Sequence, residues 1–204
     1  MSEGMLGGIT LASVAGLIND LLEKLTSKEG EKWLSAFKRF LRKENPWPQF
    51  PTWRTIKLGT HKSVKSLVEA IEAKGFKIGD WARNIAKNVT LAEKMTEVEL
   101  VVVTGHDVGL EGNYTTIQMF TAAAAHGLSK CPAEVGLQLR LQYDDQPNNE
   151  WLLIAMEPIA DSDCGLNVFN VAHIGFGCWL RTNYGHPGNV CFTDDRWVFL
   201  RSKQ

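Results

Sequence analysis

The stretch from Cys131 to Ile159, CPAEVGLQLRLQYDDQPNNEWLLIAMEPI, decides which fold the sequence predicts. Pro132 at a first helical position, with Glu134 in the first turn, is typical of a short helix start. The leucines of LQLRLQY (137–143) then alternate with polar residues. Because a period of two is typical of a strand with one apolar and one polar face, residues 137–143 are expected to form a β-strand.

The residues that follow predict further strands. Residues 144–149 (DDQPNN) have the composition of a turn, and residues 151–159 (WLLIAMEPI) are suited to a partner strand. Three more strand-like segments are separated by turn-rich sequences: 166–173, 178–183 and 196–201. The C-terminal part of the chain is therefore predicted to be an antiparallel β-meander over about residues 137–202.

The first 45 residues are expected to form a helical hairpin. Apolar residues recur every three or four positions over 10–26 and again over about 27–42, which is typical of amphipathic helices and short coiled-coil seams. Asn45-Pro-Trp-Pro then ends the second helix, because proline cannot continue a helix. We therefore predict an N-terminal appendage over residues 1–45 that can self-associate, followed by a domain over 46–204.

The domain over residues 46–204 is expected to combine helices with the sheet. Helical spacing or capping residues occur at 62–74, 78–85 and 115–124, and strand-like patterns occur at 53–58 and 97–104. In the second of these helices, Trp81 and Ile85 are expected to face the core. Together with the meander, this succession predicts the α+β class.

The net charge of −1 conceals an uneven distribution of charge along the chain. Residues 1–90 carry 15 Lys and Arg against 9 Asp and Glu, whereas residues 91–204 carry 7 against 14. A basic half can bind nucleic acid, here through four side chains on one helix: Lys38, Arg39, Arg42 and Lys43. Basic residues are also favoured at helix C-termini, so a purely structural role explains this cluster as well.

Cysteine spacing and hydropathy bear on cofactors and location. The cysteines include no C-x-x-C pair and match no zinc-binding pattern, so no metal or other cofactor is predicted: Cys131, Cys164, Cys178 and Cys191. No segment approaches the roughly 20 apolar residues that a membrane-spanning helix needs. The N-terminus lacks the basic start of a signal peptide. A cytoplasmic protein with reduced thiols and no membrane contact is therefore expected.

Three loop sequences carry residue types used in catalysis or metal binding, and each has a simpler explanation. The His-Asp pair at 106–107 follows a strand, but neighbours in sequence usually point apart and no nucleophile follows at a known spacing. The sequence DSDCG (161–165) starts like a calcium loop but lacks the later ligands, so a plain turn is favoured. The acidic pair at 194–195 can do acid–base chemistry with Glu157 only if the fold brings them together.

Several blocks of the sequence together resemble an uncharacterised protein family found mainly in genomes of uncultivated bacteria. The blocks are EKWLSAFKRFLRKENPW (31–47), WRTIKLGT (53–60), FKIGDWA (76–82), the segment 131–143, EWLLIAMEPI (150–159) and DDRWVF (194–199). The similarity spans about residues 31–202. This resemblance implies a bacterial intracellular protein with one stable architecture, and it implies no activity, cofactor or functional residue.

The leading functional hypothesis is a non-catalytic binding or interaction module. Seven tryptophans are many for 204 residues, and tryptophan is favoured at binding surfaces. The binding surface is expected on the polar face of the predicted sheet and its loops, with seven candidate residues: Glu134, Arg140, Gln142, Trp151, Glu157, Arg181 and Arg196. The alternative is a small carboxylate-dependent hydrolase, with or without a metal, acting on nucleic acid. Nucleic-acid binding by the basic half is the second alternative.

Overall fold

The computed structural model describes residues 11–41, 50–175 and 177–201 of the chain. The chain divides into two compact units, which we describe separately. Unit 1 spans Met1–Gln49 and unit 2 spans Phe50–Gln204.

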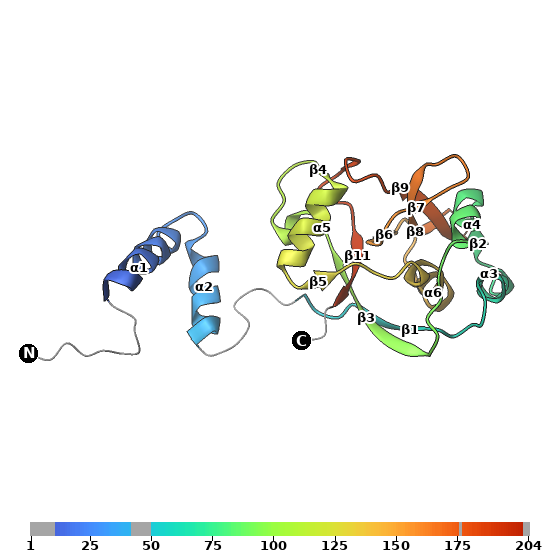
Figure 1. The fold of residues 1–204 in the computed structure, drawn as a ribbon, viewed down its shortest axis with the longest axis horizontal. Helices are drawn as coiled ribbons and strands as arrows, with labels where there is room; N and C mark the ends of the chain where they lie inside the picture. The colour runs from blue at the N-terminus through green and yellow to red at the C-terminus, as the bar shows by residue number, and fades with distance from the viewer. Residues whose placement is uncertain (1–10, 42–49, 176, 202–204) are drawn as a thin grey trace, which may run out of the picture. The chain divides into compact units, whose positions relative to one another are not determined.

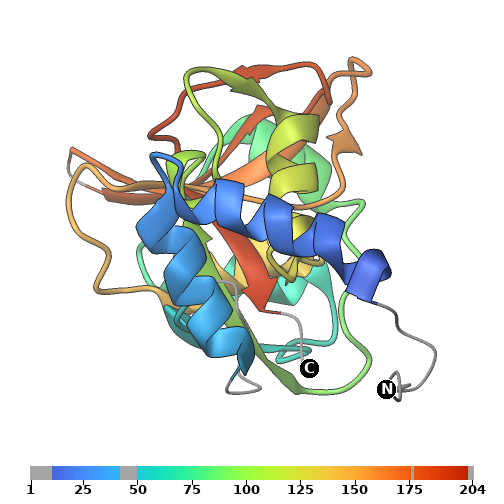
Figure 2. The ribbon, with the colours of Figure 1, turned by 90° about the vertical axis from the view of Figure 1, so that its left-hand side faces the viewer.

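The described part of unit 1 consists of two helices, α1 (Leu11–Leu25) and α2 (Gly30–Leu41), joined by a short turn (Figures 1 and 2). The ammonium of Lys24 lies 4.8 Å from the centre of the Trp33 ring, so the helices contact each other. Large apolar side chains nevertheless remain exposed on both helices: Leu17, Ile18, Leu22, Leu34, Phe40 and Leu41. Such residues are normally buried against another surface.

Unit 2 contains helices and a large mixed sheet, as expected for the α+β class. Its helices are α3 (Val64–Ala73), α4 (Asp80–Ala86), α5 (Thr116–Ala125), α6 (Glu134–Gln142) and the short 3₁₀ helix η1 (His106–Val108). Its strands are β1 (Arg54–Leu58), β2 (Lys77–Ile78), β3 (Thr96–Val103), β4 (Tyr114–Thr115), β5 (Leu128–Ser129), β6 (Trp151–Ile154), β7 (Ile159–Ala160), β8 (Leu166–Ile174), β9 (Gly177–Tyr184), β10 (Val190–Cys191) and β11 (Trp197–Arg201).

The strands of the large sheet follow the order β1-β3-β11-β6-β8-β9-β2, with β5 paired to β11 and β7 paired to β8. Two of the pairs, β11 with β6 and β2 with β9, are parallel, and the others are antiparallel. The prediction of a simple C-terminal antiparallel meander was therefore wrong in its strand order. Strands β6, β8 and β9 are neighbours, but β11 inserts between β3 and β6 instead of following β9.

Helices cover both faces of the sheet and enclose two cores (Figure 1). Helices α3, α4 and α6 lie on one face, where Ile71, Ile85 and Leu137 join the first core. Helix α5 lies on the opposite face, where Met119 and Phe120 pack against sheet residues such as Trp197 in the second core. Most of the buried apolar surface that stabilises unit 2 is in these two layers.

Two helices of unit 2 begin with side-chain caps, of which the cap at the start of α5 was expected from the sequence. Ser63 precedes α3 and its side chain accepts a hydrogen bond from the Ser66 N–H. Thr115 precedes α5 and forms a reciprocal capping box with Gln118. Both contacts satisfy N–H groups that a helix start otherwise leaves without a partner.

The segment 137–143 is the main error of the sequence-based prediction, because it belongs to helix α6 and not to a strand. Helix α6 is surrounded by protein on almost all sides, and even Gln138 and Arg140 are buried. A helix that is buried on all sides does not need its apolar residues on one face. The alternation of leucines therefore could not distinguish a helix from a strand. Leu, Gln, Arg and Glu are all good helix formers, and this local preference decided the structure.

Candidate ligand-binding site

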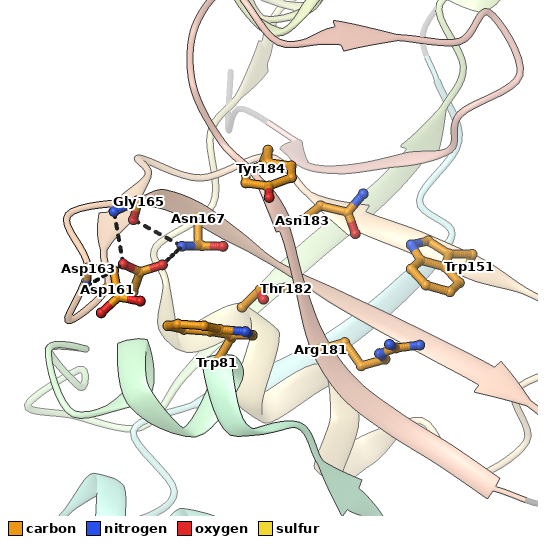
Figure 3. Close-up of a pocket in the computed structure, with 10 residues that line it drawn as sticks. All are labelled: Trp81, Trp151, Asp161, Asp163, Gly165, Asn167, Arg181, Thr182, Asn183 and Tyr184. Atoms are coloured by element: carbon orange, nitrogen blue, oxygen red, sulfur yellow. Dashed lines mark hydrogen bonds between the residues drawn. The ribbon is translucent and has the colours of Figure 1, made fainter.

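An open hollow of about 540 Å³ lies at the outer edge of β9. It is lined by ten residues, which Figure 3 shows: Trp81, Trp151, Asp161, Asp163, Gly165, Asn167, Arg181, Thr182, Asn183 and Tyr184. The lining combines aromatic rings with amides, carboxylates and one guanidinium, a mixture typical of ligand sites.

Strand β9 runs through the site and presents its residues alternately to two sides (Figure 3). Residues directly opposite each other on paired strands share a face. Thr182 is opposite Phe169 of the first core, so it lies on the face covered by α4 and α6. Arg181 is opposite Asn170, which is itself opposite Leu153 of the second core, so Arg181 lies on the other face.

The three large aromatic side chains of the site come from three different elements and are solvent-exposed. Trp81 of α4 is 49% exposed, Trp151 of β6 is 38% exposed and Tyr184 of β9 is 75% exposed. Trp81 was expected to face the core together with Ile85, and for Trp81 this was wrong. Ile85 is fully buried, and the first turn of α4 leaves the indole of Trp81 at the hollow (Figure 3).

Arg181 is the cation of the site. Its guanidinium lies 5.5 Å from the centre of the Trp151 ring, a distance typical of cation–π contacts. Among the described residues, no carboxylate lies within ion-pairing distance of Arg181. The guanidinium is therefore oriented by Trp151 while its N–H groups remain available to a ligand.

Next to Arg181, a buried amide fixes the orientation of Asn183. The Nδ2 of Asn170, a fully buried residue, donates to the Oδ1 of Asn183 at 2.5 Å. This bond leaves the Nδ2 of Asn183 as the group that can donate to a ligand. A polar group held in this way loses little conformational freedom on binding.

The turn from Asp161 to Gly165 forms one wall of the hollow. The Oδ1 of Asp161 accepts hydrogen bonds from the backbone N–H groups of Asp163 and Gly165, at 2.9 and 2.8 Å. Its Oδ2 accepts from the Nδ2 of Asn167 at 2.6 Å. Desolvation acts to raise the pKa of Asp161, but these three hydrogen bonds outweigh it and lower the pKa below its ordinary value. Asp161 thus shapes the wall, whereas the carboxylate of Asp163 is exposed.

Three of the seven predicted binding residues lie on α6 and have structural contacts instead. Glu134 is buried, and its carboxylate accepts from the backbone N–H groups of Gly59 and Ala92, each at 2.7 Å. Gln142 bonds both backbone groups of Lys57 in β1, accepting from the N–H at 2.9 Å and donating to the carbonyl at 2.8 Å. Arg140 is fully buried. None of the three is on a polar sheet face.

Arg140 is enclosed without a carboxylate bonded to it among the described residues. Its Nη1 donates to the Oε1 of Gln146 at 2.6 Å and its Nη2 donates to the carbonyl of Tyr143. The guanidinium lies 4.5 Å from the centre of the Phe76 ring. Burial lowers the pKa of Arg140. These contacts link α6 to the chain that follows it, so we assign Arg140 to the folded core and not to the surface.

The remaining predicted residues divide into two groups. Trp151 and Arg181 meet in the hollow. Glu157 accepts from the Lys130 Nζ at 2.7 Å, and Arg196 pairs with Glu150 at 2.7 Å. The structure therefore unites two of the seven candidates in one site and gives the other five partners elsewhere.

The other candidate groups of the sequence also have local structural contacts. Asp107 accepts from the N–H and hydroxyl of Thr104, and Asp195 accepts from the Phe192 N–H at 2.8 Å. In residues 11–41, 50–175 and 177–201, no group of three or more His, Cys, Asp or Glu is arranged to hold a metal ion. Of the basic cluster, Lys38 is exposed on α2, whereas Arg42 and Lys43 lie outside the described residues; Arg39 belongs to α2.

Three of the four thiols are buried, and two of them lie where the reactive thiolate is disfavoured. Cys131, Cys178 and Cys191 are buried, and Cys164 is exposed. Burial raises the pKa of Cys131 and of Cys191 above the ordinary value of a thiol. A raised pKa disfavours the thiolate, which is the reactive form.

Sequence reasoning missed half of the ten residues of the hollow, namely Trp81, Asn167, Thr182, Asn183 and Tyr184. One sequence feature was available for Trp81: an aromatic residue directly after Gly79-Asp80 is in the first turn of a helix and can face outward. For Asn183 and Tyr184, alternation along β9 predicts opposite faces but not which elements flank them.

Comparison of the chain with models of protein families, with curated proteins and with solved structures found no match in any of the three. Among the helices of the described residues, none has the length and apolar character needed to cross a membrane.

Proposed function

We propose that the protein is a non-catalytic binding module whose ligand occupies the hollow at the outer edge of β9. One observation carries this proposal: exposed rings of Trp81, Trp151 and Tyr184 converge on one open site with Arg181, which has no ion pair among the described residues. Exposed large aromatic side chains lose contact with water when a ligand covers them, which favours binding.

The preorganisation of the polar groups supports binding rather than a structural role. Arg181 is held against Trp151, and Asn183 is held by Asn170. The turn at Asp161 is fixed by the hydrogen bond from the Gly165 N–H to the Asp161 carboxylate. A site whose donors are oriented before the ligand arrives gains affinity, because less conformational entropy is lost on binding. Stabilising the fold alone does not explain why these donor groups are held in place while they face solvent.

The proposal is tested by screening the whole chain against pools of end-blocked peptides, oligosaccharides and mononucleotides, with tryptophan fluorescence and amide chemical shifts as readouts. We expect a pool to shift the amide resonances of β9, and we expect Trp81→Ala and Trp151→Ala each to weaken that binding at least about tenfold. Phe192→Ala is the matched control, because Phe192 is 61% exposed but does not line the hollow. Binding that is unaffected by both tryptophan variants would overturn the proposal.

We further infer that α1 and α2 form a helical hairpin appended to this binding domain, and that the hairpin self-associates. The exposed apolar side chains on both helices, among them Leu17, Phe40 and Leu41, favour an interface. The solution mass of the chain, measured with and without residues 1–49, tests this. A mass that corresponds to one chain in both cases contradicts self-association.

A further inference from the structure

From the proposed function, on which this inference rests, we infer the class of ligand: an extended peptide segment of another protein that binds as an additional strand on the outer edge of β9. Its backbone would pair with Thr182 and Tyr184, and its side chains would point alternately to the two sides of the hollow. This is strand addition to an open sheet edge, in which main-chain hydrogen bonds supply affinity and alternate side chains supply specificity.

The first observation is that the outer edge of β9 is open beside the hollow. Strand β2 pairs with β9 only at Trp179 and Leu180, and no other described strand pairs with β9 on that side. The Gly79 N–H donates to the Leu180 carbonyl at 2.9 Å, which shows that the backbone groups of Leu180 point outward. Because these directions alternate along a strand, the N–H and C=O groups of Thr182 and Tyr184 also point outward.

The second observation is that the opposite edge of the same sheet is partly capped by side chains. At β1, Gln142 bonds the N–H and the carbonyl of Lys57 as a neighbouring strand would, and Glu134 accepts from the Gly59 N–H. Open edges promote unwanted pairing between chains, and proteins commonly block them. Side chains of α6 thus bond part of the β1 edge, whereas among the described strands none pairs with the outer side of β9 at residues 181–184, next to the hollow.

The third observation is that the hollow has two sides that fit alternate side chains of a strand. Trp81 and Asp163 lie on the side of Thr182, whereas Arg181, Asn183 and Trp151 lie on the other side of β9 (Figure 3). A basic side chain of the peptide suits Asp163 and Trp81, and an acidic or aromatic side chain suits Arg181 and Trp151. A peptide with basic residues at every second position, and acidic or aromatic residues between them, therefore matches the site.

The probe is a pool of N-acetylated, C-amidated hexapeptides with Lys or Arg at alternate positions and Glu, Phe or Tyr between them. The control pool has the same composition with the basic residues grouped at one end. We expect the alternating pool to bind the whole chain at least about tenfold more tightly than the grouped pool, because only alternation places each type of side chain on its own side.

The decisive variants are Thr182→Pro and Thr182→Val. Proline removes the outward N–H and is tolerated at an open strand edge, whereas valine keeps the N–H and the approximate shape of threonine. We expect proline to weaken peptide binding at least about tenfold, because the ligand carbonyl loses its donor, and valine to leave binding unchanged. A thermal melt of each variant checks folding.

Hydrogen exchange on the unaltered chain provides a test that needs no variant. In the free protein, we expect the amides of Arg181 and Asn183, which face β8, to exchange slowly and those of Thr182 and Tyr184 to exchange fast. The alternating peptides should then slow the exchange of Thr182 and Tyr184.

Several results would overturn the inference. Examples are peptide binding that Thr182→Pro leaves intact, peptides that do not protect the Thr182 amide, or an oligosaccharide or nucleotide that binds the hollow while both peptide pools fail. In each of these cases a tryptophan-dependent ligand can still exist, so the proposed function survives. A chain that is dimeric alone and becomes monomeric with Thr182→Pro would show that a second copy, and not another protein, occupies the edge.

Discussion

Glu134 shows how a polar residue that resembles part of a functional site can belong to the interior. Its carboxylate accepts hydrogen bonds from the N–H groups of Gly59 and Ala92 and from the Nε2 of Gln138. Three donors from separate segments thus meet at one side chain, of which 1% is exposed. A buried carboxylate is tolerated when its hydrogen bonds are made, so its presence alone is no evidence of catalysis.

We expect Glu134→Ala to lower the free energy of unfolding by about 2–4 kcal/mol, because two buried backbone N–H groups lose their acceptor. Glu134→Gln, which keeps one acceptor oxygen, should cost less. Urea unfolding of the whole chain measures both. Glu157→Ala is the control: Glu157 is exposed and its pair with Lys130 should contribute less than about 1 kcal/mol. A Glu134→Ala variant as stable as that control would contradict this assignment.

Asp161 gives a prediction about pH. Its hydrogen bonds lower its pKa in the folded protein below the ordinary value of 3.8. The stability that Asp161 contributes is therefore complete above that ordinary value and is lost as the pH falls through the lower folded value. Carboxyl carbon NMR should find a midpoint below 3.8 for Asp161. Asp161→Asn should lower the melting temperature at neutral pH more than at strongly acidic pH. A midpoint at or above the ordinary value would refute the role of the turn.

At the scale of elements, α6 shows why part of the fold was predicted and part was not. Helix α3 and strands β3 and β8 follow clear periods or strong β-branched content, and they lie where the sequence placed them. In α6, Glu134, Gln138 and Gln142 are also spaced by four residues, and each is hydrogen-bonded to the next. Residues at every second position also include residues four apart. The same polar residues therefore fit both a strand and a helix, and the sequence could not exclude either.

The binding site was less predictable than the elements that form it. Trp151 and Arg181 were identified because both are polar or amphipathic residues on strands, but Trp81 precedes them by 70 or more positions. Their meeting depends on the sheet order, in which β2 pairs in parallel with β9 and brings α4 alongside. Strand order follows from packing between distant segments, and no local pattern specifies it.

The contact between α6 and β8 depends on a glycine. A Cβ at Gly136 would lie 2.7 Å from the Cβ of Phe169, so any larger residue forces the helix away from the strand. We expect Gly136→Ala to reduce the free energy of unfolding by about 1–3 kcal/mol, despite the better helix propensity of alanine. Denaturant unfolding measures this. Adding Phe169→Leu should recover part of the loss of stability, and an additive double variant would contradict the proposed clash.

For the whole molecule, the two cores show that unit 2 contains its own stabilising interactions. The buried apolar residues of both cores lie between Ile56 and Phe199, so no described residue of unit 1 contributes to them. We expect removal of residues 1–49 to change the melting temperature of the remaining chain by no more than about 4 °C. Differential scanning calorimetry checks this. A much larger decrease would show that the N-terminal helices pack into unit 2.

The ladder of Glu134, Gln138 and Gln142 also limits how copies of this protein can assemble. A sheet that accepts strands at both ends can add copies without limit and grow into a fibre. Here the α6 side chains bond the outward backbone groups of Lys57 and the N–H of Gly59 at the β1 end, which disfavours the addition of a strand there. We therefore expect chains that join through β9 to form closed pairs and not fibres. In this way Gln142, which does not line the hollow, limits the growth that an open β9 edge would otherwise permit.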